Sequence, residues 1–117
     1  MHELSIAEAL VQSAAAWCRE NRRKALALKI AIGRIGGVDP EALKIAWPMA
    51  LDVVDNPDLT GCRLEIEVLP LRFGCTQCGA ETEAERLIWV CPSCGGESLR
   101  RKGGCELLLQ SIEVEDV

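Results

Sequence analysis

The amino-acid sequence predicts an α+β fold in which two helices cover a small three-stranded sheet. Apolar residues recur with the helical period over residues 4–22 and 40–54, and they alternate with period two in three other segments. The segments follow the order helix, strand, helix, strand, strand, and a cysteine-rich stretch interrupts the chain before the last strand. Because each strand has one apolar face and two amphipathic helices can cover it, a two-layer sandwich is the economical architecture.

The first helix is expected over residues 4–22. Its apolar side carries Leu4, Ala7, Leu10, Val11, Ala14, Trp17 and Cys18. Ser5 and Glu8 match a capping box, in which the serine hydroxyl accepts from the backbone N–H of Glu8 and the glutamate reaches back to Ser5. This pattern places residues 1–3 outside the first turn, as a short exposed lead.

The first strand and the second helix follow. Leu26, Leu28, Ile30 and Ile32 share one face of a strand that ends at the glycines after residue 35. The second helix is expected to begin at Pro40, with Asp39 as its N-cap. Pro48 lies well past the first turn, so it removes a helical hydrogen bond and is expected to kink or split this helix, at a cost of about 3 kcal/mol if nothing relieves it.

The segment "CRLEIEVLPL" from Cys62 is the clearest strand, and the last strand begins at Cys105. Between them the composition changes, because residues 74–104 are rich in Cys and Gly and poor in aliphatic side chains. We therefore predict an α/β domain of residues 1–73 plus 105–117, with a ribbon of residues 74–104 inserted in it.

Length, composition and charge exclude several classes of protein. A chain of 117 residues suits about one domain, and no run of eighteen apolar residues predicts a membrane span. Glu3 and Glu8 interrupt what would have to be a signal peptide, so we expect a cytoplasmic protein. The net charge of −5 argues against a surface for nucleic acid or an anionic membrane.

Four cysteines in the ribbon have the spacing of a metal site. Cys75, Cys78, Cys91 and Cys94 read C-x2-C-x12-C-x2-C, and each pair can direct two sulfur atoms at one tetrahedral ion. Zn²⁺ is the expected ion, and the competing interpretation, two disulfides, is disfavoured in a chain without a secretion signal. Four thiolates leave no position for a reactive water, so the zinc is expected to be structural.

A ribbon of this kind has two other possible functions. A nucleic-acid-binding or protein-interaction ribbon is one alternative, but residues 74–104 lack the basic stripe that nucleic-acid binding requires. Their basic and acidic side chains are equal in number: Arg86, Arg100, Arg101 and Lys102, and Glu81, Glu83, Glu85 and Glu97. A dithiol redox protein is the other, and it needs a Cys pair at a helix start, which neither pair provides. With no nucleophile, paired carboxylates or open metal site, no enzymatic activity is expected.

The three remaining cysteines are Cys18, Cys62 and Cys105. Each falls on the expected helix or at the start of a strand, where a free cysteine usually serves as a small buried apolar residue. Cys62 and Cys105 begin neighbouring strands, and their spacing does not decide whether they approach each other.

The only histidine, His2, adjoins the α-amino group. The amine of Met1, the backbone nitrogen of His2 and its imidazole Nδ1 can chelate one ion through fused rings, and the amide of Glu3 can add a further nitrogen. Planar nitrogen donors of this kind suit Ni²⁺ or Cu²⁺.

Together these motifs resemble the HypA/HybF family of hydrogenase maturation factors. The segments "MHELSIAEAL", "GRIGGVDPEAL", "GCRLEIEVLP", "CPSCG" and "ELLLQSIEVED" occur in this order over essentially the whole chain. The combination of a Met-His-Glu start with two C-x-x-C pairs carries the resemblance, since neither half would suffice alone.

The resemblance implies a nickel metallochaperone with an α/β domain and a zinc ribbon. Nickel would be held by Met1, His2 and Glu3, and zinc by the four ribbon cysteines. Asp39 stands where some members have a carboxylate close to nickel, although its place as a helix N-cap explains it locally. The implied partners are the GTPase HypB and the large subunit of a [NiFe] hydrogenase, to which Ni(II) would be delivered.

The chain also departs from the family pattern. Cys105 stands where an arginine is usual, and the second helix carries "IAWP" where aromatic-rich "FAF"-like residues are usual. No histidine flanks the two C-x-x-C pairs, so a zinc shell of sulfur alone is expected.

Overall fold

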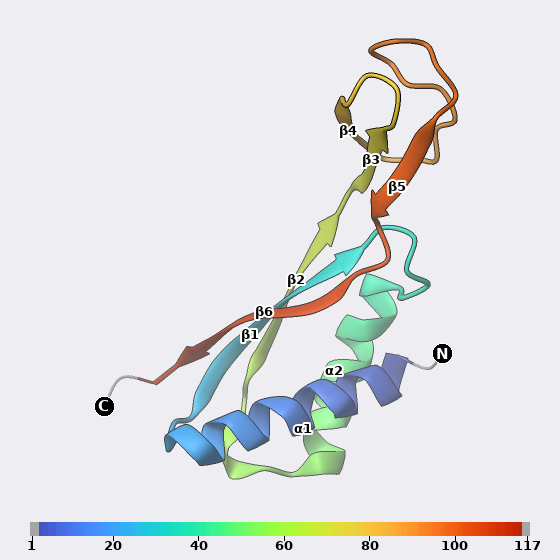
Figure 1. Ribbon diagram of the computed structural model, residues 1–117. Helices are drawn as coiled ribbons and strands as arrows, with labels where there is room; N and C mark the ends of the chain where they lie inside the picture. The colour runs from blue at the N-terminus through green and yellow to red at the C-terminus, as the bar shows by residue number, and fades with distance from the viewer. Residues whose placement is uncertain (1–2, 116–117) are drawn as a thin grey trace.

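The computed structural model describes residues 3–115. The elements along the chain are α1 (Glu3–Asn21), β1 (Ala25–Gly33), α2 (Pro40–Val54), the short 3₁₀ helix η1 (Pro57–Leu59), β2 (Arg63–Leu69), β3 (Leu71–Cys75), β4 (Glu81–Ala84), β5 (Leu99–Gly103) and β6 (Leu107–Val114). The molecule is elongated, about 54 × 29 × 16 Å, because a ribbon projects from one end of a helix-covered sheet (Figure 1).

The larger body is the predicted two-layer sandwich. Its three strands lie in the order β2-β1-β6, with β1 parallel to β2 and antiparallel to β6. Both helices lie on one side of this sheet (Figure 1). The helix α2 is the crossover that connects the parallel pair β1 and β2, as a parallel connection requires. The predicted fold class is therefore confirmed.

The core lies between the helices and the covered face of β1. Buried apolar side chains come from α1, β1 and α2: Ile6, Ala7, Leu10, Val11, Ala14, Cys18, Leu28, Ile30, Ile32, Leu43, Ala46, Trp47 and Ala50. The indole Nε1 of Trp47 donates to the carbonyl oxygen of Cys62 at 2.8 Å, which satisfies its polar atom and ties α2 to the start of β2.

On the face of the sheet that no helix covers, the central strand β1 carries small residues. Ala27 and Ala31 are buried there although no helix covers them. Long side chains of the two outer strands cross over β1: Arg63 bonds Glu113 at 3.1 Å, and Gln110 donates to Glu67 at 3.2 Å. Alanine on the central strand thus leaves room for these polar bridges.

The start of α1 differs from the prediction. The helix begins at Glu3, so Ser5 lies inside its first turn and cannot be the N-cap, and the capping box with Glu8 is wrong. Residues 1 and 2 lie outside the described residues. Trp17, which was expected on the apolar side, is 38% exposed.

Of the two effects predicted for Pro48, a kink or a split of α2, the split is wrong and the kink stays a prediction. The helix runs as one element from Pro40 to Val54, and Pro48 lies on its exposed face. A carbonyl that loses its N–H partner on this face can be hydrated, which lowers the cost of the proline.

The second strand is shorter than predicted, because Pro70 separates β2 from β3. From Leu71 onward the chain belongs to the ribbon, whose strands lie in the order β4-β3-β5, all antiparallel. The ribbon sheet begins at Leu71 and ends at Gly103, and two connections join it to the body (Figure 1).

The three cysteines outside the ribbon turns occupy different environments. Cys18 and Cys62 are buried as predicted, at 0% and 3% exposure. Cys105 is exposed, so the prediction that it is a buried apolar residue is wrong. Because β6 is antiparallel to β1, Cys105 lies at the far end of the sheet from Cys62 and the two do not approach each other. Among residues 3–115, no helix is long and apolar enough to cross a membrane.

Candidate metal centres

The four ribbon cysteines converge on one point. Their Sγ atoms all lie within 4.8 Å of one another, and the pairs Cys75 with Cys94 and Cys78 with Cys91 are both 3.7 Å apart. A tetrahedral ion with bonds of about 2.3 Å to sulfur requires its ligands to be about 3.8 Å apart. The donor set and its spacing therefore fit Zn²⁺, and all four cysteines are free of disulfides.

The two cysteine turns have matching backbone geometry. Gly79 N–H donates to the carbonyl of Cys75 at 3.0 Å, and Gly95 N–H donates to the carbonyl of Cys91 at 2.8 Å. Both glycines adopt positive φ, +77° and +73°, which lets each turn close behind its second cysteine. In the second turn, Gly96 N–H also points at the sulfur of Cys94, at 3.4 Å.

The surroundings of the sulfurs favour thiolate at two positions. Backbone N–H groups of Cys78 and Gln77 lower the pKa of Cys75 to about 7, and that of Cys94 lowers the pKa of Cys91. The pKa of Cys94 rises to about 11: Gly96 N–H lowers it, but desolvation and the neighbouring thiols prevail. Four crowded thiols thus do not all ionise readily by themselves, and a bound cation is what favours the fully deprotonated set.

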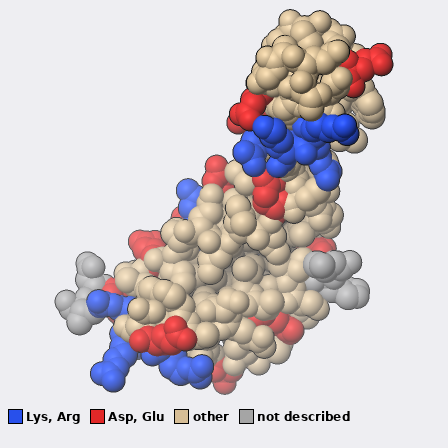
Figure 2. All heavy atoms as spheres, viewed as in Figure 1, with Lys and Arg blue, Asp and Glu red and all other residues tan. Residues whose placement is uncertain are grey.

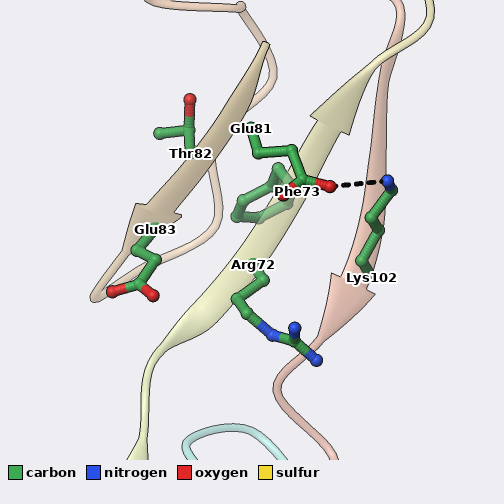
Figure 3. A pocket seen from close by; sticks show the side chains of 6 residues that line it. All are labelled: Arg72, Phe73, Glu81, Thr82, Glu83 and Lys102. Carbon is green, nitrogen blue, oxygen red and sulfur yellow. Dashed lines mark hydrogen bonds and ion pairs between the residues drawn. The ribbon is translucent and has the colours of Figure 1, made fainter. Parts of the chain in front are cut away.

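A polar cluster lies on strands β3, β4 and β5 of the ribbon (Figure 3). Lys102 Nζ bonds Glu81 Oε1 at 2.9 Å, and Arg72 lies on the same face, beside a hollow of about 280 Å³ that Phe73 also lines. Lys102, through its hydrogen bond and its charge, lowers the pKa of Glu81. In Figure 2 the blue Lys and Arg side chains gather in a band across this part of the ribbon, with red Asp and Glu side chains directly beside them. The band is balanced by its acids, which gives no support to the nucleic-acid alternative.

A tight joint connects the ribbon to the body. Gly33 N–H donates to the carbonyl of Glu106 at 2.7 Å, and Ile35 N–H donates to the carbonyl of Gly104 at 2.8 Å. A Cβ at Gly33 would collide with the backbone of Gly104, so only glycine allows this approach.

Glu106 stabilises the same joint through its side chain. Its carboxylate accepts from Gly104 N–H at 2.6 Å and contacts Arg72 at 3.4 Å. Backbone N–H groups, that of Glu106 first and then that of Gly104, lower its pKa, and the charge of Arg72 adds to the effect. Glu106 is not among the residues predicted from the sequence, where its only signal is the Gly-Gly pair before it.

Of the predicted nickel residues, Glu3 lies at the start of α1 and Asp39 immediately precedes α2. Met1 and His2 fall outside the described residues. Glu3 is the first described residue of α1, and its Oε2 is buried without a hydrogen-bond partner among residues 3–115. Asp39 is exposed and caps α2, since its Oδ1 accepts from Glu41 N–H at 3.0 Å. The ribbon cysteines form the only cluster of three or more metal-binding side chains within residues 3–115.

Comparison with known proteins agrees with these features. A family model described as "Hydrogenase/urease nickel incorporation, metallochaperone, hypA" matches residues 1–114. The chain belongs to the HypA family. Hydrogenase maturation factors HypA from Synechococcus elongatus and Geobacter metallireducens are 37% and 34% identical to it. These matches cover 97% and 98% of this chain and 99% and 100% of the relatives.

Solved HypA structures share the fold. A solution structure of HypA superposes with a TM-score of 0.74 at 20% identity, covering 98% of this chain and 97% of that one. The solution structure of the Ni metallochaperone HypA from Helicobacter pylori gives 0.68 at 21% identity, with 97% of both chains covered. Membership of a nickel metallochaperone family in hydrogenase maturation thus rests on sequence, and the fold is independently similar.

Loss of one zinc ligand tests the role of the cysteine cluster. The ribbon of Cys78→Ser is expected to lose its zinc and its ordered structure, because metal binding supplies much of the folding energy of such a small unit. The sheet of β1, β2 and β6 should persist, since its core contains no ribbon residue. Metal analysis and amide hydrogen exchange measure the two effects, with Ser93→Ala as the control. A fully protected ribbon in metal-free Cys78→Ser protein would contradict this assignment.

Proposed function

We propose that this chain binds Ni(II) through Met1, His2 and Glu3 and delivers it to the large subunit of a [NiFe] hydrogenase. The GTPase HypB is the proposed partner in this transfer, which takes place in the cytoplasm, and the chain acts as a carrier and not as an enzyme. The proposal combines membership of the HypA family with the position of Glu3, the observation on which it rests most.

The start of α1 is chemically suited to hold a cation near Glu3. The first N–H groups of a helix have no partner inside the helix, so the Glu3 amide nitrogen can bind metal without breaking a helical hydrogen bond. The buried Oε2 of Glu3 lacks a donor among residues 3–115, and a cation would satisfy it. Both donors would then belong to the residue next to the only imidazole of the chain.

The cysteine cluster of the ribbon supports a separate nickel site by exclusion. Its four sulfurs occupy all positions of a tetrahedral ion, so the ribbon has no vacancy for a second metal in transit. Nickel therefore needs a separate site, and nitrogen donors suit it.

Release of nickel would follow from the small span of the site. Its donors come from consecutive residues, so a bend between His2 and Glu3, or fraying of the first turn of α1, would separate them. The imidazole and the amides must lose protons to bind metal, so affinity is expected to fall as the pH drops through about 6.5.

Nickel titration of zinc-loaded protein tests the N-terminal site. His2→Ala, and separately a version with residues added before Met1, should each bind Ni²⁺ at least about tenfold more weakly, because each removes one nitrogen of the chelate. Glu8→Gln, a change on the same helix outside the site, is the matched control and should bind normally. Native affinity in both altered proteins would show that the N-terminus is not the nickel site.

Asp39 is a subsidiary candidate that a separate set of variants can decide. Its Oδ1 caps α2, which leaves the second carboxylate oxygen for a metal, and α2 begins on the side of the molecule where α1 begins (Figure 1). Asp39→Asn keeps a capping side chain but removes the charge. We expect it to weaken nickel binding less than His2→Ala does, with an unchanged melting temperature.

The control for this set is Asp39→Ser, which also caps the helix without a carboxylate and should behave like Asp39→Asn. Nickel affinity equal to native in both variants would leave Asp39 as a helix cap only.

A further inference from the structure

Three apolar side chains form an exposed row on α2. Ile45, Met49 and Val53 are 73%, 52% and 64% exposed. Their four-residue spacing places them one above the other along the helix, over a length of about 12 Å. The core residues of α2 lie on another side of the helix: Leu43, Ala46, Trp47 and Ala50. The apolar surface of α2 is thus wider than the part that the rest of the molecule covers.

Hydrogen-bond acceptors lie beside this apolar row. Pro48 has no N–H, so the carbonyl oxygen of Lys44 lacks its usual helical donor. Asp52 and Asp55 follow Pro48 on the same side of the helix, and both are exposed. These two carboxylates and Pro48 also line a hollow of about 230 Å³ near the end of the helix. An apolar row therefore runs next to a polar row that can accept but lacks matching donors.

The two aspartates are uncompensated in charge. Neither Asp52 nor Asp55 has an ion-pair partner within residues 3–115, and the last turn of α2 carries no basic residue. Negative charge is unfavourable at the C-terminal end of a helix, because the helix dipole is itself negative there. A cation supplied from outside the chain would relieve this repulsion, so the polar row is complementary to a basic group.

We propose that this outer face of α2, formed by Ile45, Met49, Val53, Asp52 and Asp55, is a docking surface for a basic amphipathic helix of a partner protein. The apolar row of the partner packs on the apolar row of α2. A partner helix that runs antiparallel to α2 brings a lysine or arginine of its first turn to the two aspartates. Its N-terminal N–H groups then lie at the negative end of α2. The surface is separate from the proposed nickel site and does not depend on it.

A helix fits this surface better than an extended segment does. The backbone groups of α2 bond mostly within the helix, so they offer no ladder on which a strand could add, whereas a partner helix satisfies its own backbone. A second copy of α2 is also a poor occupant. The face and its margin carry three acidic side chains, Glu41, Asp52 and Asp55, and one basic side chain, Lys44, so two copies would repel each other.

Titration of the ¹⁵N-labelled, zinc-loaded protein with a model helix tests the proposal without nickel. The probe is an alanine-based peptide of about four helical turns, with leucine at every fourth position and two lysines in its first turn. We expect saturable binding, amide shifts centred on residues 41–55, and an affinity that falls as salt is added. The same peptide with glutamate in place of both lysines should bind at least about tenfold more weakly.

Variants of the protein separate the apolar row from the charges. Met49→Glu should raise the dissociation constant of the peptide at least about tenfold, with an unchanged melting temperature because the side chain is exposed. Leu87→Glu is the matched control, since Leu87 is a comparably exposed apolar residue of the ribbon, and it should bind normally. Asp52→Asn combined with Asp55→Asn should remove most of the salt dependence, and asparagine tolerates the left-handed backbone of residue 55.

The proposal is overturned if the peptide does not bind, or if its shifts map to another surface, such as the groove between Leu107 and α1. Native affinity in folded Met49→Glu, or an unchanged salt dependence in the double aspartate variant, would also overturn it. Shifts of the α2 amides that depend on the concentration of the protein alone would make a second copy the occupant, and would contradict the proposed heterologous partner.

Discussion

The convergence of four cysteine sulfurs, with a spacing that fits one tetrahedral zinc ion, is the constraint on which the ribbon depends. The ribbon contributes few buried apolar residues, namely Leu71, Phe73 and the cysteines Cys75 and Cys91, so a hydrophobic core cannot stabilise it alone. A cluster that binds zinc in this way is also saturated, because each thiolate fills one corner of a tetrahedron. A protein that carries nickel on this scaffold therefore needs a second, separate set of donors. The rest of the proposed mechanism depends on that separation between a fixed ion and a transient one.

The helix-covered sheet anchors the start of α1, where Glu3 of the proposed nickel site lies. Six buried residues fix α1 against β1 and α2, so the start of α1 is anchored although only a few residues would touch the metal. The ribbon leaves the sheet through the joint of Gly33, Gly104 and Glu106, at the end of the molecule where α1 also begins (Figure 1). A partner that contacts the ribbon would thus lie on the same side as the proposed nickel donors.

Periodicity and spacing predicted the parts of this molecule that depend on local sequence. Alternation in residues 25–32 identified β1, and the two C-x-x-C pairs identified the cysteine cluster. The predictions that were wrong concern features that tertiary contacts decide and local sequence does not show. Ser5 is a good capping residue, yet packing of α1 extends the helix to Glu3, and Pro48 is tolerated because its side of α2 faces solvent. The exposure of Cys105 and the role of Glu106 both follow from the close approach of two glycines that are distant in sequence.

X-ray absorption at the nickel edge of protein loaded with one zinc and one nickel tests the central claim most directly. The account predicts a first shell of nitrogen and oxygen, including an imidazole, with no sulfur neighbour, and a zinc edge that still reports four sulfurs. Nickel–sulfur scattering, with a zinc shell that has lost sulfur, would contradict it, since the two metals would then share the ribbon cysteines.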